Sequence, residues 1–277
     1  MELLITIAII AVLAALLLPT LSRAREEGRG TVSLSNLRQL TFAMHTYAGD
    51  HDDQLPYNMG VEGTHNTVAA GEYLNWVNNV MSWELDEENT NTTLLTIGGL
   101  GPYVAEVGKV FKCPSDNVLS ERQRKAGWTM RVRSYSMNAM LGNAGPEFME
   151  GGSNKNNPGY KQFLRLGDVA EPSRIFSFVE EHPDSIDDGY FLNKFHSYSW
   201  NDLPASYHNG KAHFAFTDGH SESRRWRNGS TTPPPRPDAA GLPISILPGQ
   251  RSDFYWVMSR TSVLTPSEEA SATAASY

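Results

Sequence analysis

The segment MELLITIAIIAVLAALLLPT at the start of the sequence constrains the fold more than any other feature. Leu3 to Leu18 are sixteen residues without a charge, and Thr6 is the only polar residue among them. This run is slightly shorter than the ~17–25 residues that span a bilayer alone, and longer than the ~7–15 apolar residues of a signal peptide. No basic residue precedes the run, and Pro19-Thr20-Leu21 makes a poor cleavage site. We therefore expect a retained membrane anchor.

Beyond Pro19 the pattern becomes amphipathic, which predicts that one face of a long helix packs on a folded domain. The helix should end where Gly49 meets Asp50, and Pro19, Gly28 and Gly30 predict local bending or melting within it. The positions that recur at three- and four-residue steps are Leu34, Leu37, Leu40, Thr41, Met44 and Tyr47.

Short apolar runs separated by turn residues predict an antiparallel sheet behind this helix. RIFSFV (174–179) and AHFAF (212–216) are rich in β-branched or aromatic residues, and AHFAFTDGHSESRRW predicts a hairpin with Asp218-Gly219 at its turn. The expected fold class is therefore α+β: a long N-terminal α-helix, hydrophobic then amphipathic, packed on a C-terminal antiparallel β-sheet domain with long loops.

The chain divides into three predicted parts. In the last part, DFYWVM (253–258) is expected to be a final strand or a docking patch, and the Ser/Ala-rich tail is expected to be disordered. The parts are a helix at 1–49 whose residues 1–20 form the membrane or filament-core segment, a soluble α+β domain at 50–230, and a Pro-rich linker with a C-terminal segment at 231–277.

Composition limits the partners and the covalent chemistry. The formal net charge is −8 and the sequence pI is 5.5, and no Lys/Arg cluster after residue 38 resembles a phosphate-binding stripe. Nucleic acid is therefore not expected as a partner. Cys113 is the single cysteine, so an internal disulfide is excluded, and we interpret it as a small buried residue rather than a reactive thiol.

The N-terminal segment resembles the methylation segment of type IV pilins and type II secretion pseudopilins. Glu2 and Pro19 reproduce that family's interval of seventeen residues, and LSRAREEGRGTVSLSNLRQL resembles the continuation of its helix. Met1 stands where the family has an interior residue. We therefore expect that the chain begins late, and the alternative is that this copy has lost processing.

A second resemblance covers the soluble domain. Many bacterial pseudopilin-like proteins carry a His, nine residues and then Asp-Gly, and His208 with Asp218-Gly219 has this spacing in YHNGKAHFAFTDGH. The segments VFKCPSD, RSYSMNAMLGN and EPSRIFSFVEEHPDSIDDGYF also resemble this family. We expect an architectural role for the motif, in which His208 and Asp218 tie the two ends of a hairpin together by hydrogen bonds.

These resemblances imply a non-enzymatic structural subunit of an extracellular or periplasmic pilus- or pseudopilus-like filament. The chain would wait in the inner membrane, be processed by a prepilin peptidase, and then polymerise with its own copies through the N-terminal helix with the help of the assembly machinery. Glu2 is the residue that would set the register between subunits, and Pro19 is the second assembly residue.

A loop of carboxylates suggests a possible cofactor. Glu180, Glu181, Asp184, Asp187 and Asp188 lie within nine residues, and hard oxygen ligands on a loop suit Ca²⁺. The spacing does not match the EF-hand pattern. A calcium site is therefore weighed against a solvated acidic loop that caps local turns, and no cofactor is otherwise expected.

Two further functions remain as alternatives. A minor pseudopilin or membrane-anchored binding module would use the aromatic residues Trp76, Trp83 and Trp200 to contact polysaccharide or cargo. A membrane-anchored hydrolase would use a metal or acid/base group drawn from His208, His213, His220 and Asp218. We assign no catalytic residue, because no nucleophile elbow, phosphate loop or metalloprotease motif is present.

Overall fold

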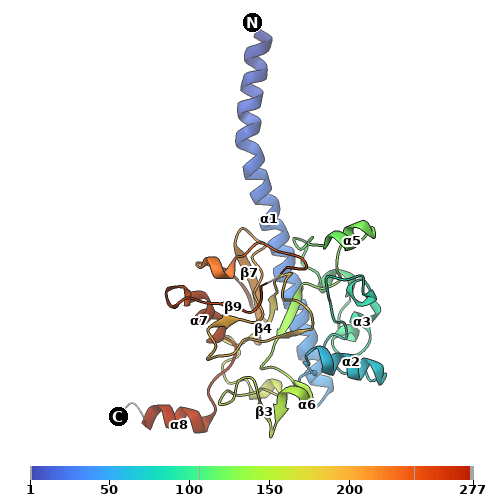
Figure 1. The fold of residues 1–277 in the computed structure, drawn as a ribbon, viewed down its shortest axis with the longest axis vertical. Coiled ribbons are helices and arrows are strands. Elements are labelled where there is room, and N and C mark those ends of the chain that lie inside the picture. Colours follow the sequence, from blue (N-terminus) through green and yellow to red (C-terminus); the bar gives the residue numbers. More distant parts are fainter. Residues whose placement is uncertain (1, 106, 240, 275–277) are drawn as a thin grey trace.

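A computed structural model describes residues 2–105, 107–239 and 241–274, and its dominant feature is a single long helix. Helix α1 (Glu2–Asp50) contains 49 residues and runs without a break through Pro19. Its N-terminal half stands clear of the domain, and its C-terminal half lies along it (Figure 1). The predicted end at Asp50 is confirmed. The predicted melting at Gly28 and Gly30 is wrong, because the residues stay helical and Gly30 is packed closely against the domain.

The C-terminal half of α1 buries the predicted face. Leu37, Leu40, Thr41 and Met44 are fully buried there, whereas Phe42 on the other side is exposed. The helix contacts strands β7 (Lys211–Phe216), β4 (Phe176–Glu180) and β8 (Ser221–Arg225) of the sheet. The apolar side chains of α1 join the larger core cluster. The fold is therefore α+β, as predicted.

The central sheet has five strands in the order β5-β1-β4-β7-β8. All neighbouring pairs are antiparallel except β1 with β5, which is parallel. The predicted hairpin is confirmed as β7 and β8, and Gly219 has the positive φ of +94° that its turn requires. The strands are β1 (Tyr135–Asn138), β4 (Phe176–Glu180), β5 (Tyr190–Phe191), β7 (Lys211–Phe216) and β8 (Ser221–Arg225).

The two faces of the sheet bury different segments. A register shift in β4 between Phe176 and Phe178 places these rings in different core clusters. Phe178 packs in the cluster of α1, and its ring lies edge-on to Trp76 with centroids 5.1 Å apart. Phe176 packs in the second cluster with Phe214 and Trp200. The bulge therefore lets one strand supply large side chains to both faces.

The C-terminal part differs from the prediction. DFYWVM is neither a strand nor a free docking patch, because it forms most of helix α7 (Ser252–Met258). Phe254, Val257 and Met258 are buried in the second core cluster, so this segment completes the domain. Helix α8 (Pro266–Ala274) occupies most of the tail that was predicted to be disordered. The spacing of Phe254, Val257 and Met258 by three and four residues is helical, and burial of that face stabilises the helix.

Short elements in the long loops complete the fold. The helices are α2 (Val61–Ala69), α3 (Thr93–Thr96), α4 (Val107–Val110), α5 (Glu121–Lys125) and α6 (Gly145–Phe148), and the remaining strands are β2 (Met149–Glu150), β3 (Ser153–Asn154), β6 (Ser199–Trp200) and β9 (Ile244–Ser245).

Candidate functional site

The first candidate site is the apolar half of α1, which is exposed in the chain on its own. Ile5, Leu13 and Leu18 have exposed fractions of 57%, 53% and 67%. The described part of α1 is long and apolar enough to cross a membrane, and none of its most apolar window is buried. Such a helix could serve as a membrane anchor or a signal sequence. Among the described residues of this half, the other exposed large apolar side chains are Ile7, Ile9, Ile10, Val12, Leu16, Leu17 and Leu21.

The two predicted assembly residues both belong to this half. Glu2 begins the helix, but its side chain lies outside the described part of the structure. Pro19 sits inside the helix and is exposed. Thr20, next to it, donates a hydrogen bond from its hydroxyl to the carbonyl oxygen of Leu17 at 2.8 Å. This bond satisfies one backbone acceptor near the proline.

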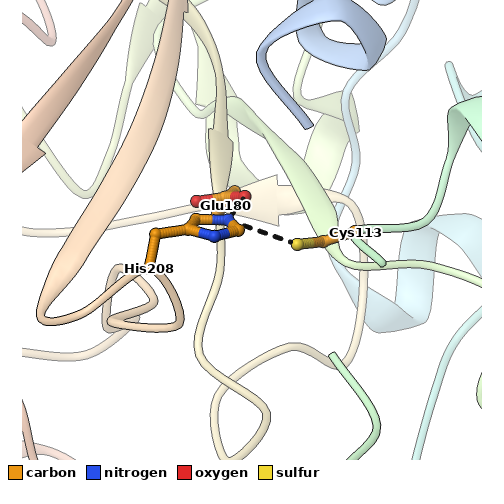
Figure 2. A group of neighbouring side chains, drawn as sticks. All are labelled: Cys113, Glu180 and His208. Atoms are coloured by element: carbon orange, nitrogen blue, oxygen red, sulfur yellow. Dashed lines mark hydrogen bonds and ion pairs between the residues drawn. The ribbon is translucent and has the colours of Figure 1, made fainter. Parts of the chain in front are cut away.

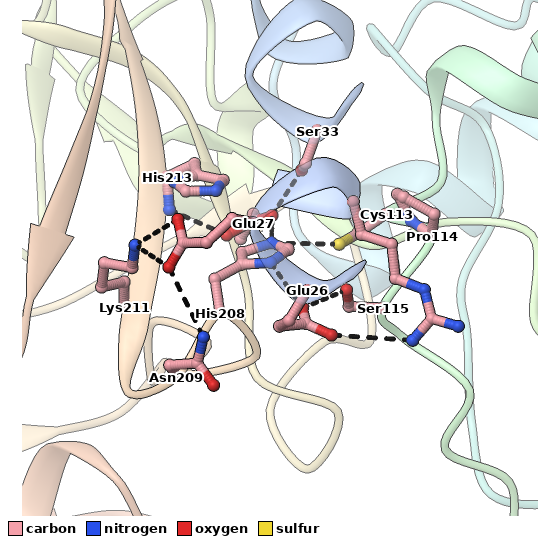
Figure 3. Close-up of polar contacts among 12 residues, drawn as sticks. Glu26, Glu27, Ser33, Cys113, Pro114, Ser115, His208, Asn209, Lys211 and His213 are labelled. Atoms are coloured by element: carbon pink, nitrogen blue, oxygen red, sulfur yellow. Dashed lines mark hydrogen bonds and ion pairs between the residues drawn. The ribbon is translucent and has the colours of Figure 1, made fainter. Parts of the chain in front are cut away.

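The second candidate site lies where α1 meets the sheet, and its centre is His208. This residue lies in the turn before β7, and its ring stands between the carboxylates of Glu26 (Figure 3) and Glu180 (Figure 2). Nδ1 lies 2.8 Å from Oε1 of Glu26 on α1, and Nε2 lies 2.8 Å from Oε1 of Glu180 on β4. Beside it, Lys211 Nζ lies 2.8 Å from both carboxylate oxygens of Glu27. The helix is therefore joined to the sheet by charged groups as well as by apolar contacts.

The geometry favours the cationic form of His208. Its side chain is 1% exposed, and both ring nitrogens need a proton to donate to the carboxylates. Burial opposes the charge, but the hydrogen bonds and attraction from Glu180 and Glu26 outweigh it and raise the pKa of His208. Burial also works against ionisation of Glu180, yet His208 and its other donors lower the pKa of that carboxyl.

The other groups around Glu180 complete its hydrogen bonds. Oε1 also accepts from the Ser33 hydroxyl of α1, and Oε2 accepts from the backbone N–H of His213 at 2.8 Å. Cys113 Sγ lies 3.5 Å from His208 Nε2 on the remaining side. Burial, followed by the charge of Glu180, raises the pKa of the Cys113 thiol well above its usual value. Without a bound cation Cys113 is therefore a protonated thiol, as expected for a small buried residue.

His213 stacks on His208 and approaches the helix closely. The two rings have centroids 4.2 Å apart and planes within 12° of parallel. His213 Nδ1 lies 2.9 Å from the Ser223 hydroxyl, while its buried Nε2 has no hydrogen-bond partner among the described residues. A Cβ atom on Gly30 would lie 2.9 Å from that Nε2. Glycine at position 30 therefore allows the helix to approach the two stacked rings.

Comparison with known proteins identifies the family of this chain. A family model described as "Protein of unknown function (DUF1559)" matches residues 22–171, which is more than half of the chain. The chain belongs to this family. No curated protein and no solved structure gives a match. In this DUF1559 chain, the matched range includes Glu26, Ser33 and Cys113 but ends before Glu180 and His208.

The predicted bond between His208 and Asp218 is wrong. In the described part of the chain, no hydrogen bond joins the two side chains; His208 bonds to Glu26 and Glu180 instead. Asp218 Oδ1 accepts from the backbone N–H of His220 at 3.1 Å and lies 2.6 Å from its Nδ1. Asp218 and Gly219 therefore form the hairpin turn, while His208 joins the hairpin to α1.

The sequence interpretation missed Glu26, Gly30 and Ser33. A signal was present, because these positions continue the buried stripe of Leu37 and Leu40 upstream in steps of three and four residues. Their side chains are polar or absent, so they did not register as part of an apolar face.

The five predicted calcium ligands face different surroundings. Glu180 belongs to the His208 cluster, and Asp184 accepts from the backbone N–H of Arg236 at 2.8 Å. Asp187 accepts from the N–H of Asp188, and Asp188 accepts from the N–H of Tyr190. The three aspartates thus accept from backbone N–H groups, and calcium binding stays a prediction.

Buried carboxyl groups in and beside this loop resist ionisation. Burial raises the pKa of Glu181 to about 8, and burial with mutual repulsion raises the pKa values of Asp188 and Asp202 well above their usual range. Arg133 is fully buried beside them and donates to the carbonyl oxygen of Asp187 at 3.0 Å. The interior here therefore holds several buried carboxyl groups next to one buried cation, the guanidinium of Arg133.

The tryptophans predicted to contact ligands are mostly core residues. Trp76 and Trp200 are both 0% exposed, because they belong to the two apolar clusters that flank the sheet. Trp83 is partly exposed, and the guanidinium of Arg131 lies 4.0 Å from its ring centroid. Trp76 and Trp200 thus cannot form the exposed binding surface that was predicted.

Proposed function

We propose that this chain is a structural subunit of a pilus- or pseudopilus-like filament that assembles through the apolar half of α1. One observation carries the proposal: α1 is a continuous helix, the described side chains of its first half are exposed, and its second half is fixed to the domain. Each methylene group moved out of water contributes about 0.8 kcal/mol. Lipid can bury this surface in an anchored monomer, and identical helices can bury it in a polymer.

The proposed sequence of events follows from the two halves of the helix. In the inner membrane, residues 2–21 lie in lipid and the domain faces the periplasm. On assembly, with the secretion or pilus machinery as partner, the same residues pack against other copies and the domains cover the outside. A carboxylate in an apolar helix core needs a cationic partner, so Glu2 is proposed to pair with the N-terminal amine of a neighbouring subunit.

Variants of Glu2 test this proposal. In cells that express the assembly machinery, we expect wild-type chain in sheared surface fractions as filaments visible by electron microscopy. Glu2→Leu should remain in the membrane fraction but lose the filaments, because insertion needs only apolar length. Glu72→Gln, a substitution of an exposed carboxylate on the domain, is the matched control and should polymerise normally. Finding only detergent-soluble wild-type monomer, or normal fibres from Glu2→Leu, would contradict the proposal.

The runner-up is a membrane-anchored binding module, and a cleft near α7 favours it. The cleft has a volume of about 750 Å³, within the usual range of ligand sites. Tyr160, Phe195, Tyr198 and Tyr255 line it, and Tyr255 is 51% exposed. Aromatic faces of this kind suit sugar rings. Glycan-array binding that is lost in Tyr255→Ala, from a chain that forms no filaments, would favour this second function.

A further inference from the structure

Three chemically different ligand atoms meet at the junction of α1 and the sheet. Within the described ranges, Cys113, Glu180 and His208 are the group of metal-ligating side chains whose donor atoms all lie within 4.8 Å of one another. Figure 2 shows the Cys113 thiol and the Glu180 carboxylate directed at the His208 imidazole from different segments of the chain. We propose that these residues bind one divalent transition-metal ion of the zinc class.

The donor set fits such an ion. Thiolate, imidazole and carboxylate are the three ligand types that Zn²⁺ takes in proteins, and a site with three protein ligands keeps a fourth position for solvent or another oxygen. The hydroxyl of Ser33 already donates to Glu180 and lies at the edge of the group. A thiolate also discriminates against Ca²⁺ and Mg²⁺, which prefer oxygen. The proposed site is therefore distinct from the calcium site suggested by the acidic loop.

The residues around the three ligands match the supporting shell of a metal site. A metal-bound histidine almost always donates its other ring N–H to a carboxylate or carbonyl. His208 offers Nε2 to the site and directs Nδ1 to Glu26 at 2.8 Å. Glu180 uses Oε1 toward the site, while its Oε2 is fixed by the backbone N–H of His213. Both ligand side chains are therefore held in a defined orientation before an ion arrives.

Binding is an exchange of protons for metal. When His208 carries a proton on both ring nitrogens, its Nε2 proton is the one donated to Glu180 Oε1, and the two heavy atoms lie 2.8 Å apart. A metal ion displaces this proton and the thiol proton of Cys113, and both leave to solvent; no oxidation or reduction takes place. The resulting group contains M²⁺, one thiolate, one carboxylate and one neutral imidazole, so its own charge is balanced.

The ligands come from segments far apart in the chain, which gives the ion a structural consequence. Cys113 follows α4, Glu180 ends β4 and His208 precedes β7, while the supporting Glu26 belongs to α1. One ion would therefore tie together the segments that hold the long helix on the domain. Because the three ligands are at most 1% exposed, the ion is expected to enter during folding.

Cobalt provides the test, because a thiolate bound to Co²⁺ gives a charge-transfer band in the near ultraviolet. The full chain in detergent is unfolded in guanidinium, refolded with Co²⁺ or Zn²⁺, and desalted. We expect about one metal ion per chain, the thiolate–cobalt band, and a higher unfolding temperature than after refolding with chelator. Since Cys113 is the single cysteine, the band in the wild-type chain identifies the ligand without any variant.

Variants then separate the ligands from their supports. Cys113→Ser should lose the band and most of the metal, and Glu26→Gln should weaken affinity by about 10- to 100-fold while retaining the band. His196→Gln, which alters an exposed histidine, should bind like the wild type. The proposal is overturned if correctly refolded wild-type chain retains no metal, or if Cys113→Ser binds as much as the wild type. These measurements involve no filament, so their failure leaves the proposed function unaffected.

Discussion

At the scale of single residues, the junction under α1 depends on charges whose partners are remote in sequence. Glu180 is fully buried, and it keeps its charge because His208, Ser33 and the His213 N–H surround it. Removing one member of a buried charged pair commonly costs about 3–5 kcal/mol, since the other charge is left without compensation. The junction therefore fixes the position of the helix more specifically than apolar packing alone.

The acidic group beyond β4 gives a pH prediction. Burial, and then repulsion from neighbouring carboxylates, raises the pKa of Asp202 well above its ordinary value of 3.8. The folded chain therefore holds this proton more tightly than the unfolded chain. The stability it contributes is fully present below pH 3.8 and falls as pH rises through the raised folded pKa, by up to about 1.4 kcal/mol per pH unit for one proton.

The substitution Asp202→Asn should remove the loss of folding stability that accompanies ionisation of Asp202. The amide oxygen can still accept the N–H of Leu192, which lies 2.6 Å from Asp202 Oδ2, but it cannot ionise. Denaturant unfolding at several pH values above 3.8 should show an advantage of the variant that grows with pH. Asp218→Asn is the control, because Asp218 lies outside this acidic group, in the β7–β8 turn. Parallel pH curves for wild type and Asp202→Asn would contradict the assignment.

The residue-level predictions from sequence succeeded only where the structure is local. Asp218 and Gly219 form a turn within the hairpin that contains them, and that turn was predicted. His208 was predicted to be structural, but its partners were not, because Glu26 is 182 residues away and Glu180 is 28 residues away. A single sequence carries no signal for such long-range pairs.

At the scale of elements, α1 offers two glycines with opposite expected behaviour. Gly28→Ala should stabilise the chain by about 1 kcal/mol, because a Cβ there meets nothing within 4 Å and alanine favours helix. Gly30→Ala should destabilise it by about 1–3 kcal/mol, because its Cβ lies 2.9 Å from His213 Nε2. The ring cannot easily move away, since it is stacked on His208 and bonded to Ser223.

Denaturant unfolding of the two variants in one detergent measures the difference. The neighbouring positions share the same helix, so intrinsic helix propensity affects both equally. Equal effects of Gly28→Ala and Gly30→Ala would mean that the helix does not approach the rings as closely as described.

Helix α7 supplies the second prediction at this scale. Phe254 is 1% exposed and packs with Trp200 at a centroid distance of 5.2 Å, whereas Tyr255 beside it is 51% exposed. Phe254→Ala should cost about 3–5 kcal/mol, and Tyr255→Ala less than about 1 kcal/mol. Thermal unfolding checks both. A small effect of Phe254→Ala would contradict the packing of α7 in the second core cluster.

Elements were predicted well where one face is apolar and the period is clear. The packed stripe of α1 follows from its three- and four-residue period, and strands β4 and β7 follow from short apolar runs bounded by turn residues. Helix α7 was missed because five consecutive large hydrophobic side chains in seven residues give no reliable period, and the preceding prolines suggested a linker. The helical structure of α7 depends on its packing against the face of the sheet that carries the second core cluster. The local sequence does not reveal that face.

At the scale of the whole molecule, the two halves of α1 should be separable. A chain that begins at Ser22 loses residues that are exposed along the apolar half, yet keeps Glu26, Gly30 and Ser33 at the junction. It should be soluble without detergent, monomeric by sedimentation, and unfold within about 2 °C of the full chain.

A longer truncation is the matched control. A chain that begins at Leu34 also loses the contacts of Glu26 and Ser33 with His208 and Glu180, so its unfolding temperature should fall clearly. A fall of the same size in the chain beginning at Ser22 would show that the apolar half supports the domain fold.

The continuity of α1 has a mechanical consequence. Its 49 residues form one unbroken helix about 70 Å long (Figure 1). The bonds from the helix to the domain follow its axis over several turns, from Glu26 and Glu27 through Arg38 and Thr41 to His45. Tension along the helix therefore loads these bonds together in shear, and the domain separates from its helix only when many of them rupture at once.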